Sequence, residues 1–357
     1  MRGLLLALAL VPGIATAEPL RIASFNTELS RDGPGLLLRD LQKGKDKQIA
    51  DVLAVIARTA PDILALQGVD WDHDRLTLDA LAKALADAGA PYPHRMALKP
   101  NSGMMTDLDL DGDGRLSGAG DAQGYGKFTG QSGMAILSRY PIDRAAVQDF
   151  SPLLWKDLPG ARLPQRGGAP FPSQTAQDAQ RLPSVGHWVV PVETPLGRIH
   201  LLTSQAGPPV FDGPEDRNGL RNRDENSFWT LFLDGALGPA PNKRFVLLGG
   251  TNLDPWDSDG YGEVVQALLD DPRLQDPRPT SNGAAQAPDQ GHRSPNATDT
   301  VDWDGVGRLR VDYVLPSRDW TVRATGVYWP ANGEDGHDTA LNASRHRLVW
   351  VDLIADE

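Results

Sequence analysis

An apolar segment that ends in two glycines and an asparagine places the strongest constraint on how this chain can fold. It runs Phe245-Val-Leu-Leu-Gly-Gly-Thr-Asn252-Leu-Asp254-Pro255. Four apolar residues before a glycine pair indicate a buried central strand followed by a tight turn. Ligand-binding groups often gather where such strands end in layered sheet proteins, so Asn252 and Asp254 are candidates for a site. Taken alone, the pattern more often marks an ordinary Asn/Asp turn.

Strand and helix patterns alternate along the rest of the chain. We expect strands at 20–25, 62–67, 134–137, 187–192, 198–203, 311–315, 322–328 and 348–354, and helices at 45–59, 76–88, 225–233 and 264–269. Residues 96–131, 149–182 and 284–300 show little periodicity and are expected to form loops. Strand–helix pairs without a repeat or a linker predict one α/β domain, in which helices cover layers of sheet.

The beginning of the chain has the composition of a secretory signal. Met1-Arg2-Gly3 is a short basic start, residues 4–11 are apolar, and Ala15-Thr16-Ala17 is a small-residue cleavage site. We expect cleavage after Ala17 and export to the periplasm or the exterior, with residues 18–357 forming a single domain. The apolar run is too short to span a bilayer, and the sequence has no later stretch of sufficient length.

Composition limits how this domain is stabilised and what it binds. The sequence contains no cysteine, so its stability rests on core packing, to which a bound metal can add, and not on disulfides. A net charge of −12 opposes general attraction to nucleic acid or to anionic membranes, whose phosphates favour a basic surface. A local basic patch can still oppose this total.

Several separated segments together resemble one known family. They are Ser24-Phe25-Asn26, Asp62-Ile-Leu-Ala-Leu-Gln67, Thr203-Ser204-Gln205, Gly249-Gly250-Thr251-Asn252, Arg310-Val-Asp312-Tyr-Val-Leu315 and Ser344-Arg345-His346-Arg347. Their order and flanking residues resemble the endonuclease/exonuclease/phosphatase superfamily of metal-dependent, deoxyribonuclease-like phosphodiesterases. The resemblance covers nearly all of the mature chain. It implies a four-layer αββα sandwich with two central mixed sheets and a site at one rim.

The resemblance implies that some site residues are retained and others are replaced. Asn26, Asn252, Asp312 and His346 match the family, in which the aspartate equivalent to Asp312 holds the final histidine in its tautomer. Four other positions depart from the family. They are Gly68 in place of a glutamate, Gly250 and Arg345 in place of aspartates, and Gln205 in place of a histidine.

These replacements weaken the case for catalysis. Hydrolysis of a phosphodiester by this family's chemistry needs a divalent metal to neutralise the phosphoryl oxygens, and Mg²⁺ prefers carboxylate ligands. Glycine offers no ligand, and Arg345 would place a permanent positive charge near the metal position. We therefore expect Mg²⁺ or Mn²⁺ to bind poorly at the family site, and the protein to be inactive or impaired.

Two other uses of the site remain open. In the first, the protein is an active phosphodiesterase with a rearranged site, in which Asp70, Asp254 or Glu28 replaces a lost ligand. These acids lie two residues beyond family positions, and the resulting shift of about 6–7 Å exceeds the tolerance of a metal site.

In the second, the protein binds a phosphate-bearing ligand or an unknown partner protein without metal. Residues 211–222 resemble a secreted bacterial branch of the family, and their Arg217, Asn218 and Arg221 could form an anion pocket with Arg345. Alternatively, Arg345 projects into solvent or pairs with a nearby acid such as Asp312.

A separate acidic segment, residues 107–121, resembles a Ca²⁺-binding loop of the EF-hand type. Asp109, Asp111 and Asp113 take its first, third and fifth positions, and a glycine takes the sixth. Arg115 would then offer its carbonyl, and Ser117 would hold the ninth position. The twelfth position is Gly120, which departs from the pattern, although Asp121 follows at once. We expect a structural Ca²⁺ ion here; the alternative is a solvated acidic turn.

Overall fold

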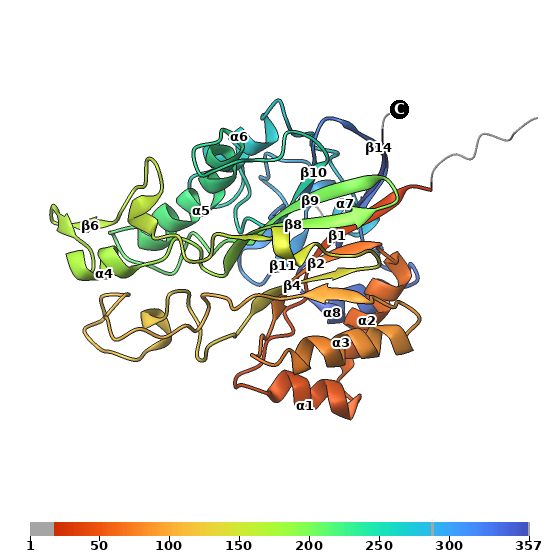
Figure 1. Cartoon of the computed structure of the whole chain (residues 1–357), viewed down its shortest axis with the longest axis horizontal. Helices are drawn as coiled ribbons and strands as arrows, with labels where there is room; N and C mark the ends of the chain where they lie inside the picture. Colours follow the sequence, from red (N-terminus) through yellow and green to blue (C-terminus); the bar gives the residue numbers. More distant parts are fainter. Residues whose placement is uncertain (1–17, 287–288, 356–357) are drawn as a thin grey trace, which may run out of the picture.

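Two mixed β-sheets stacked face to face form the centre of the protein, and helices cover their outer faces (Figure 1). The computed structural model describes residues 18–286 and 289–355. The expected signal segment, residues 1–17, lies outside the described residues. The predicted four-layer αββα sandwich is confirmed.

The first sheet has six strands, of which only the β1–β2 pair is parallel. In spatial order they are β14 (Trp320–Val327), β15 (Val349–Ala355), β1 (Leu20–Asn26), β2 (Ile63–Val69), β4 (Gly133–Ser138) and β3 (His94–Met96). Four helices pack against its outer face. They are α1 (Leu36–Lys43), α2 (Lys47–Thr59), α3 (Leu76–Asp87) and α8 (His337–Ala343).

The second sheet has five strands, of which only the β9–β10 pair is parallel. In spatial order they are β13 (Asp312–Pro316), β10 (Phe245–Gly250), β9 (Gly197–Gln205), β8 (Gly186–Thr194) and β5 (Gln148–Asp149). Its outer face is covered by α5 (Arg217–Leu233) and α6 (Glu263–Leu269).

The central strands are apolar on both faces because both faces are covered. In β10, Val246 and Leu248 point into the core between the two sheets, whereas Phe245 and Leu247 pack in the core beneath α5 and α6. This double burial explains the unbroken apolar run before the glycine pair. It also holds the end of β10 firmly in place.

Several short elements were not expected from the sequence. They are α1, α8, β3, the hairpin β6 (Gln165–Arg166) and β7 (Ala169–Pro170), α4 (Gln174–Ala179), α7 (Asn282–Gln286), β11 (Val301–Trp303) and β12 (Gly307–Leu309). In addition, α5 begins at Arg217, eight residues before its expected start. Its first half buries polar side chains, among them Arg221 and Glu225, and so carries no apolar periodicity.

Among the described residues, no helix combines the length and the apolar character needed to cross a membrane.

The core between the sheets should dominate stability. We expect Leu248→Ala to lower the free energy of unfolding by about 2–5 kcal/mol, because it leaves a cavity between two rigid sheets. Leu341→Ala, at a position in α8 that is 42% exposed, should change it by less than about 0.5 kcal/mol. Urea unfolding followed by circular dichroism measures both. Equal losses for the two variants would contradict this account of the core.

Candidate functional site

The ends of strands from both sheets meet at one rim of the sandwich. Parallel pairing sets Asn26 at the end of β1 beside Gln67 in β2. In the other sheet, Gly250 at the end of β10 lies between Gln205 and Asp312. Strand β1 also contacts β10 and β13 across the sandwich. The sheets therefore bring together side chains that are far apart in the sequence.

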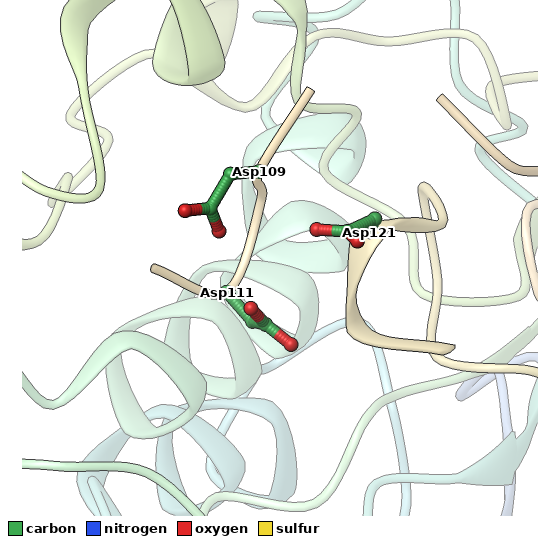
Figure 2. Close-up of side chains that lie close together, drawn as sticks. All are labelled: Asp109, Asp111 and Asp121. Atoms are coloured by element: carbon green, nitrogen blue, oxygen red, sulfur yellow. The ribbon is translucent and has the colours of Figure 1, made fainter. Parts of the chain in front are cut away.

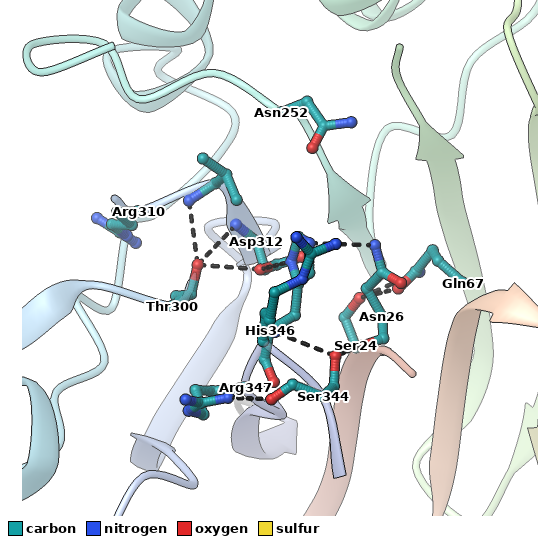
Figure 3. Close-up of polar contacts among 12 residues, drawn as sticks. Ser24, Asn26, Gln67, Asn252, Thr300, Arg310, Asp312, Ser344, His346 and Arg347 are labelled. Carbon is teal, nitrogen blue, oxygen red and sulfur yellow. Dashed lines mark hydrogen bonds and ion pairs between the residues drawn. The ribbon is translucent and has the colours of Figure 1, made fainter. Parts of the chain in front are cut away.

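A buried histidine–aspartate pair lies at this rim (Figure 3). His346 Nδ1 is 2.7 Å from Asp312 Oδ2, and Thr300 Oγ1 donates to the same carboxylate oxygen at 3.0 Å. His346 Nε2 lies 3.4 Å from Asn26 Nδ2. With Asp312 accepting from Nδ1–H, the lone pair of Nε2 faces the Asn26 amide. The resemblance assigns Asp312 the role of holding His346 in one tautomer, and a carboxylate 2.7 Å from Nδ1 has the position that this role requires.

Asn252 lies at the same rim, just beyond β10 (Figure 3). Its backbone has a φ of 49°, a left-handed conformation that asparagine tolerates better than most residues. Its Nδ2 donates to the carbonyl of Ala206 at 2.7 Å. The four retained positions, Asn26, Asn252, Asp312 and His346, thus lie on converging strand ends and loops.

Gly68 sits in a backbone conformation that excludes a side chain. Its φ is 72°, and the β2–β4 register shifts between Gln67 and Val69. A Cβ at this position would lie 2.6 Å from Asn26 Oδ1 and 2.8 Å from the backbone nitrogen of Glu28. The second contact is with backbone, so a larger residue requires the chain itself to move. This position cannot supply a carboxylate in the present geometry.

Gly250 and Gln205 fit together as a pair. A Cβ at Gly250 would lie 2.2 Å from Gln205 Oε1, so the Gln205 amide fills the space that a side chain at 250 would need. Gln205 is buried, and its Oε1 accepts no hydrogen bond from any residue that the structure describes. An amide therefore lies where the resemblance places an aspartate side chain.

Arg345 is bound to Glu28. Its Nε donates to Glu28 Oε1 at 2.9 Å, and its backbone nitrogen donates to Glu28 Oε2 at 2.8 Å. Burial favours the neutral acid, but hydrogen bonds and positive charge from Arg345 outweigh it and hold the pKa of Glu28 below its usual value. The partner of Arg345 is thus Glu28 and not Asp312, although the Arg345 side chain remains 60% exposed.

The other two acids considered as replacement metal ligands also have protein partners. Asp70 accepts from Ser30 Oγ at 2.7 Å and from the backbone nitrogens of Arg31 and Ser132 at 3.0 Å. Asp254 accepts from the backbone nitrogens of Trp256 at 2.8 Å and Arg310 at 3.0 Å. These carboxylates order loops and do not converge with Glu28 on one point of the rim.

Comparison with known proteins agrees with this arrangement. The model of the Endonuclease/Exonuclease/phosphatase family matches residues 23–346. The chain belongs to this family. Its members are typically metal-dependent phosphodiester hydrolases. Among curated proteins, the comparison found no significant sequence match.

Three solved structures show the same fold at low sequence identity. An endonuclease/exonuclease/phosphatase from Beutenbergia cavernae DSM 12333 has a TM-score of 0.54 and 17% identity, over 95% of this chain and 72% of that chain. A family protein from Leptotrichia buccalis C-1013-b has a TM-score of 0.51 and 15% identity, over 94% and 99% of the two chains. One from Bacteroides vulgatus has a TM-score of 0.51 and 12% identity, over 95% and 99%.

The residues at the rim do not fit the metal that this family employs. Mg²⁺ and Mn²⁺ need oxygen ligands, with one or two carboxylates from the protein. Here Gly68 cannot carry a side chain without backbone movement, Gly250 is covered by Gln205, and Glu28 is neutralised by Arg345. The arrangement can orient an imidazole and offer amide and guanidinium donors.

The arginines of segment 211–222 do not join Arg345 in an anion pocket, which corrects the expectation from the sequence. Arg221 is buried and donates to the carbonyls of Leu182 and Gln123, and burial lowers its pKa to about 10. Arg217 donates to Asn218 Oδ1 at 3.3 Å and to Gln180 Oε1 at 3.2 Å. Because these groups bind other parts of this chain, their role is to hold loops together.

The acidic loop gathers three carboxylates (Figure 2). One oxygen each from Asp109, Asp111 and Asp121 lies within 4.8 Å of the others. Asp121 takes the place expected for Asp113 in this group. Asp113 Oδ1 accepts from the backbone nitrogen of Arg115 at 2.7 Å. A short 3₁₀ turn, η1 (Ala119–Asp121), carries Asp121 back to the loop. The sequence signal was present, since an acid directly follows the twelfth position.

The three carboxylates are poised for a cation. Burial, followed by the negative charges of Asp113, Asp121 and Asp109, raises the pKa of Asp111. The backbone nitrogens of Gly112 and Gly114 donate to Asp109 at 2.6 and 2.9 Å, which folds the loop around the carboxylates. Ser117 has a φ of 70° and ends the turn. These carboxylate oxygens have the ligand chemistry that hard divalent cations require.

Replacement of Gly68 tests whether its position is closed. We expect Gly68→Ala to destabilise the protein more than Gly44→Ala. Both positions have positive φ, which costs a non-glycine residue about 1–2 kcal/mol, but the Cβ at Gly44 would meet no described atom within 4 Å. The clash at Gly68 should add about 1–3 kcal/mol in urea unfolding. Similar losses for both variants would show that the position can accept a side chain.

The acidic loop should respond to calcium. We expect millimolar Ca²⁺ to raise the Tm relative to protein in a chelator, because a ligand at 100 times its Kd stabilises the folded state by about 2.7 kcal/mol. Asp111→Asn should remove most of this gain. Asp87→Asn, at an exposed carboxylate paired with Lys83, should keep it. Equilibrium dialysis that finds no Ca²⁺ uptake at millimolar concentration would refute the site.

Proposed function

We propose that this chain is an exported member of the endonuclease/exonuclease/phosphatase family that has lost metal-dependent hydrolysis and binds a phosphate-bearing ligand at its rim. The observation that carries the proposal is the Arg345–Glu28 ion pair. The pair places the guanidinium of Arg345 at the rim. It also engages the carboxylate of Glu28, which could otherwise have replaced a lost metal ligand.

The groups at the rim suit binding better than turnover. Guanidinium groups bind phosphate oxygens through two parallel hydrogen bonds, and the exposed side of Arg345 is available for such a contact. His346, oriented by Asp312, and the amide of Asn26 add polar groups beside it. Hydrolysis by the family chemistry also requires neutralisation of the phosphoryl charge by a metal, and the carboxylates for that step are replaced.

Two further parts of the proposal concern the rest of the chain. Export rests on the sequence of residues 1–17, and residues 18–357 are proposed as a single mature domain. The loop containing Asp109, Asp111 and Asp121 is proposed as a structural Ca²⁺ site. In a chain without cysteine, such an ion would fasten a long loop that the core does not reach.

One observation favours a second function, an active phosphodiesterase with a rearranged site. The Asp312–His346 pair is intact, at 2.7 Å. An oriented imidazole is the general acid or base that phosphodiester hydrolysis employs, so residual turnover with another metal arrangement is the alternative.

Turnover and binding assays distinguish the two functions. We expect purified protein to hydrolyse neither bis(p-nitrophenyl) phosphate nor plasmid DNA above background with Mg²⁺, Mn²⁺ or Ca²⁺. Calorimetric titration with inorganic phosphate and with a nucleoside monophosphate should detect binding to at least one of them. Arg345→Ala should weaken that binding by about tenfold or more, as expected for loss of a charge-assisted contact worth roughly 1.5–3 kcal/mol.

Arg58→Ala is the matched control, because Arg58 is also an exposed arginine paired with one acid, Asp335. Its affinity should equal that of the unmodified protein. Metal-dependent turnover that His346→Ala abolishes would establish the alternative function. An absence of phosphate binding, or equal effects of the two arginine substitutions, would refute the proposed binding role.

A further inference from the structure

A cavity lies beside β3, the edge strand of the first sheet. Its volume is about 270 Å³, and its walls come from residues 75–79 at the start of α3, from β3 and its approach, and from residues 142–144 after β4. Strands β4 and β2 separate β3 from β1, which ends at Asn26. Three inter-strand spacings of about 4.8 Å place the axis of β3 about 14 Å from that of β1. This edge cavity is therefore separate from the site at the rim.

Positively charged side chains dominate the lining of the edge cavity. Arg75, Arg95 and Arg144 line it, and Asp79 is the one carboxylate among the lining residues that the structure describes. These four side chains give the lining a net charge of +2, whereas the whole chain carries −12. His94 adds an imidazole to the same walls. A local basic surface of this kind attracts anions although the protein as a whole is acidic.

Most hydrogen-bond donors of the three arginines remain available to a ligand. Arg95 Nε donates to Asp79 Oδ1 at 2.7 Å, and one terminal nitrogen of Arg144 donates to the backbone carbonyl of Arg95. The side chain of Arg75 donates to no residue that the structure describes. Because each guanidinium has five N–H groups, the lining can offer several donors to one anion.

The chain holds two of these arginines in place without neutralising them. Asp72 accepts from the first two backbone nitrogens of α3, both at 2.8 Å, and so fixes the turn that carries Arg75. The acid next to Arg144 in the sequence is Asp143, which accepts instead from Arg198 at 2.8 Å. The charge of Arg144 is therefore left for the cavity.

The lining also has an apolar part. Leu78, Pro93 and Ile142 line the cavity together with the arginines. Leu78 is buried and Ile142 is half-buried, so both are held by the packing around them. Sites for drug-sized ligands have volumes of about 300–1,000 Å³, so a cavity of about 270 Å³ suits a smaller molecule. A ligand that matches the whole lining combines an anionic group with a short organic part.

We propose that the edge cavity binds a small organic phosphate. The three arginines donate to the phosphate oxygens, and the apolar residues contact the organic part. A phosphate monoester carries a charge of about −1.5 to −2 at pH 7 and three strong acceptor oxygens, which matches a lining of +2. A monocarboxylate would leave part of this positive charge unbalanced.

Calorimetric titration with phenylphosphonate tests the proposal, because this analogue of a phosphate monoester has no ester bond to hydrolyse. We expect one equivalent to bind to full-length protein carrying Arg345→Ala, in which the proposed rim site is weakened. Adding Arg75→Ala or Arg144→Ala should weaken this binding by about tenfold or more, as expected for loss of a charge-assisted hydrogen bond. Phenylphosphonate should bind more tightly than inorganic phosphate, which lacks the apolar contact.

Asp79→Asn should act in the opposite direction. It removes the negative charge of the lining and releases Arg95 Nε, so binding of phenylphosphonate should become about twofold to fivefold tighter. A residue that only supports the fold would not give tighter binding when it is replaced.

Arg39→Ala is the matched control, because Arg39 is an exposed arginine of α1 that pairs with Asp40 outside the cavity. It should leave the affinity unchanged. The proposal is overturned if inorganic phosphate binds as tightly as phenylphosphonate, or if Arg75→Ala and Arg144→Ala have no more effect than Arg39→Ala.

The two proposed sites fail in different ways. Binding to the native protein that Arg345→Ala alone abolishes would assign it to the rim, which supports the proposed function and overturns the edge cavity. Binding that survives Arg345→Ala unchanged but is lost with Arg75→Ala supports the edge cavity and counts against the rim. An absence of phenylphosphonate binding to every variant overturns the edge cavity.

Discussion

The packing of one apolar sheet against another is the interaction on which the rest of this protein depends. Residues such as Val246 and Leu248 fill the space between the sheets, while their neighbours in sequence pack beneath the helices. Because both faces are buried, neither sheet can shift its register without exposing a whole apolar row. The strand ends are therefore held in fixed relative positions, and polar side chains on those ends can form a site.

At the rim positions that depart from the family, neighbouring groups fill the space or pair with the new side chain. Gln205 fills the space above Gly250, Glu28 pairs with Arg345, and Gly68 adopts a left-handed conformation that brings backbone close to where its Cβ would lie. A site that had merely lost its ligands would leave voids or unpaired charges. Here Gln205 fills the space at Gly250 and Glu28 pairs with Arg345, which supports the proposal that the rim serves a task other than metal-dependent hydrolysis.

Negative charge outside the rim is concentrated at two places. In the acidic loop Asp109 and Asp111 remain partly accessible and Asp121 is buried, and loop backbone nitrogens donate to Asp109 and Asp121. Around Asp299 the acids come from two loops, and burial of Asp299 together with the charges of Asp254, Asp289 and Asp257 raises the pKa of Asp299 to about 7. A cation bound by the acidic loop would stabilise that loop in a chain without disulfides.

The sequence by itself determined the family, the sandwich architecture and the strands of the core, because apolar runs and strand-end residues are local signals. It also pointed to the acidic loop, three of whose carboxylates the structure brings together. Only the tertiary structure decided which charged side chains contact one another. The pairing of Arg345 with Glu28, the replacement of Asp113 by Asp121 and the burial of Arg221 depend on loop paths that no periodicity encodes. Asp299 looked like an ordinary loop residue until folding buried it among other acids.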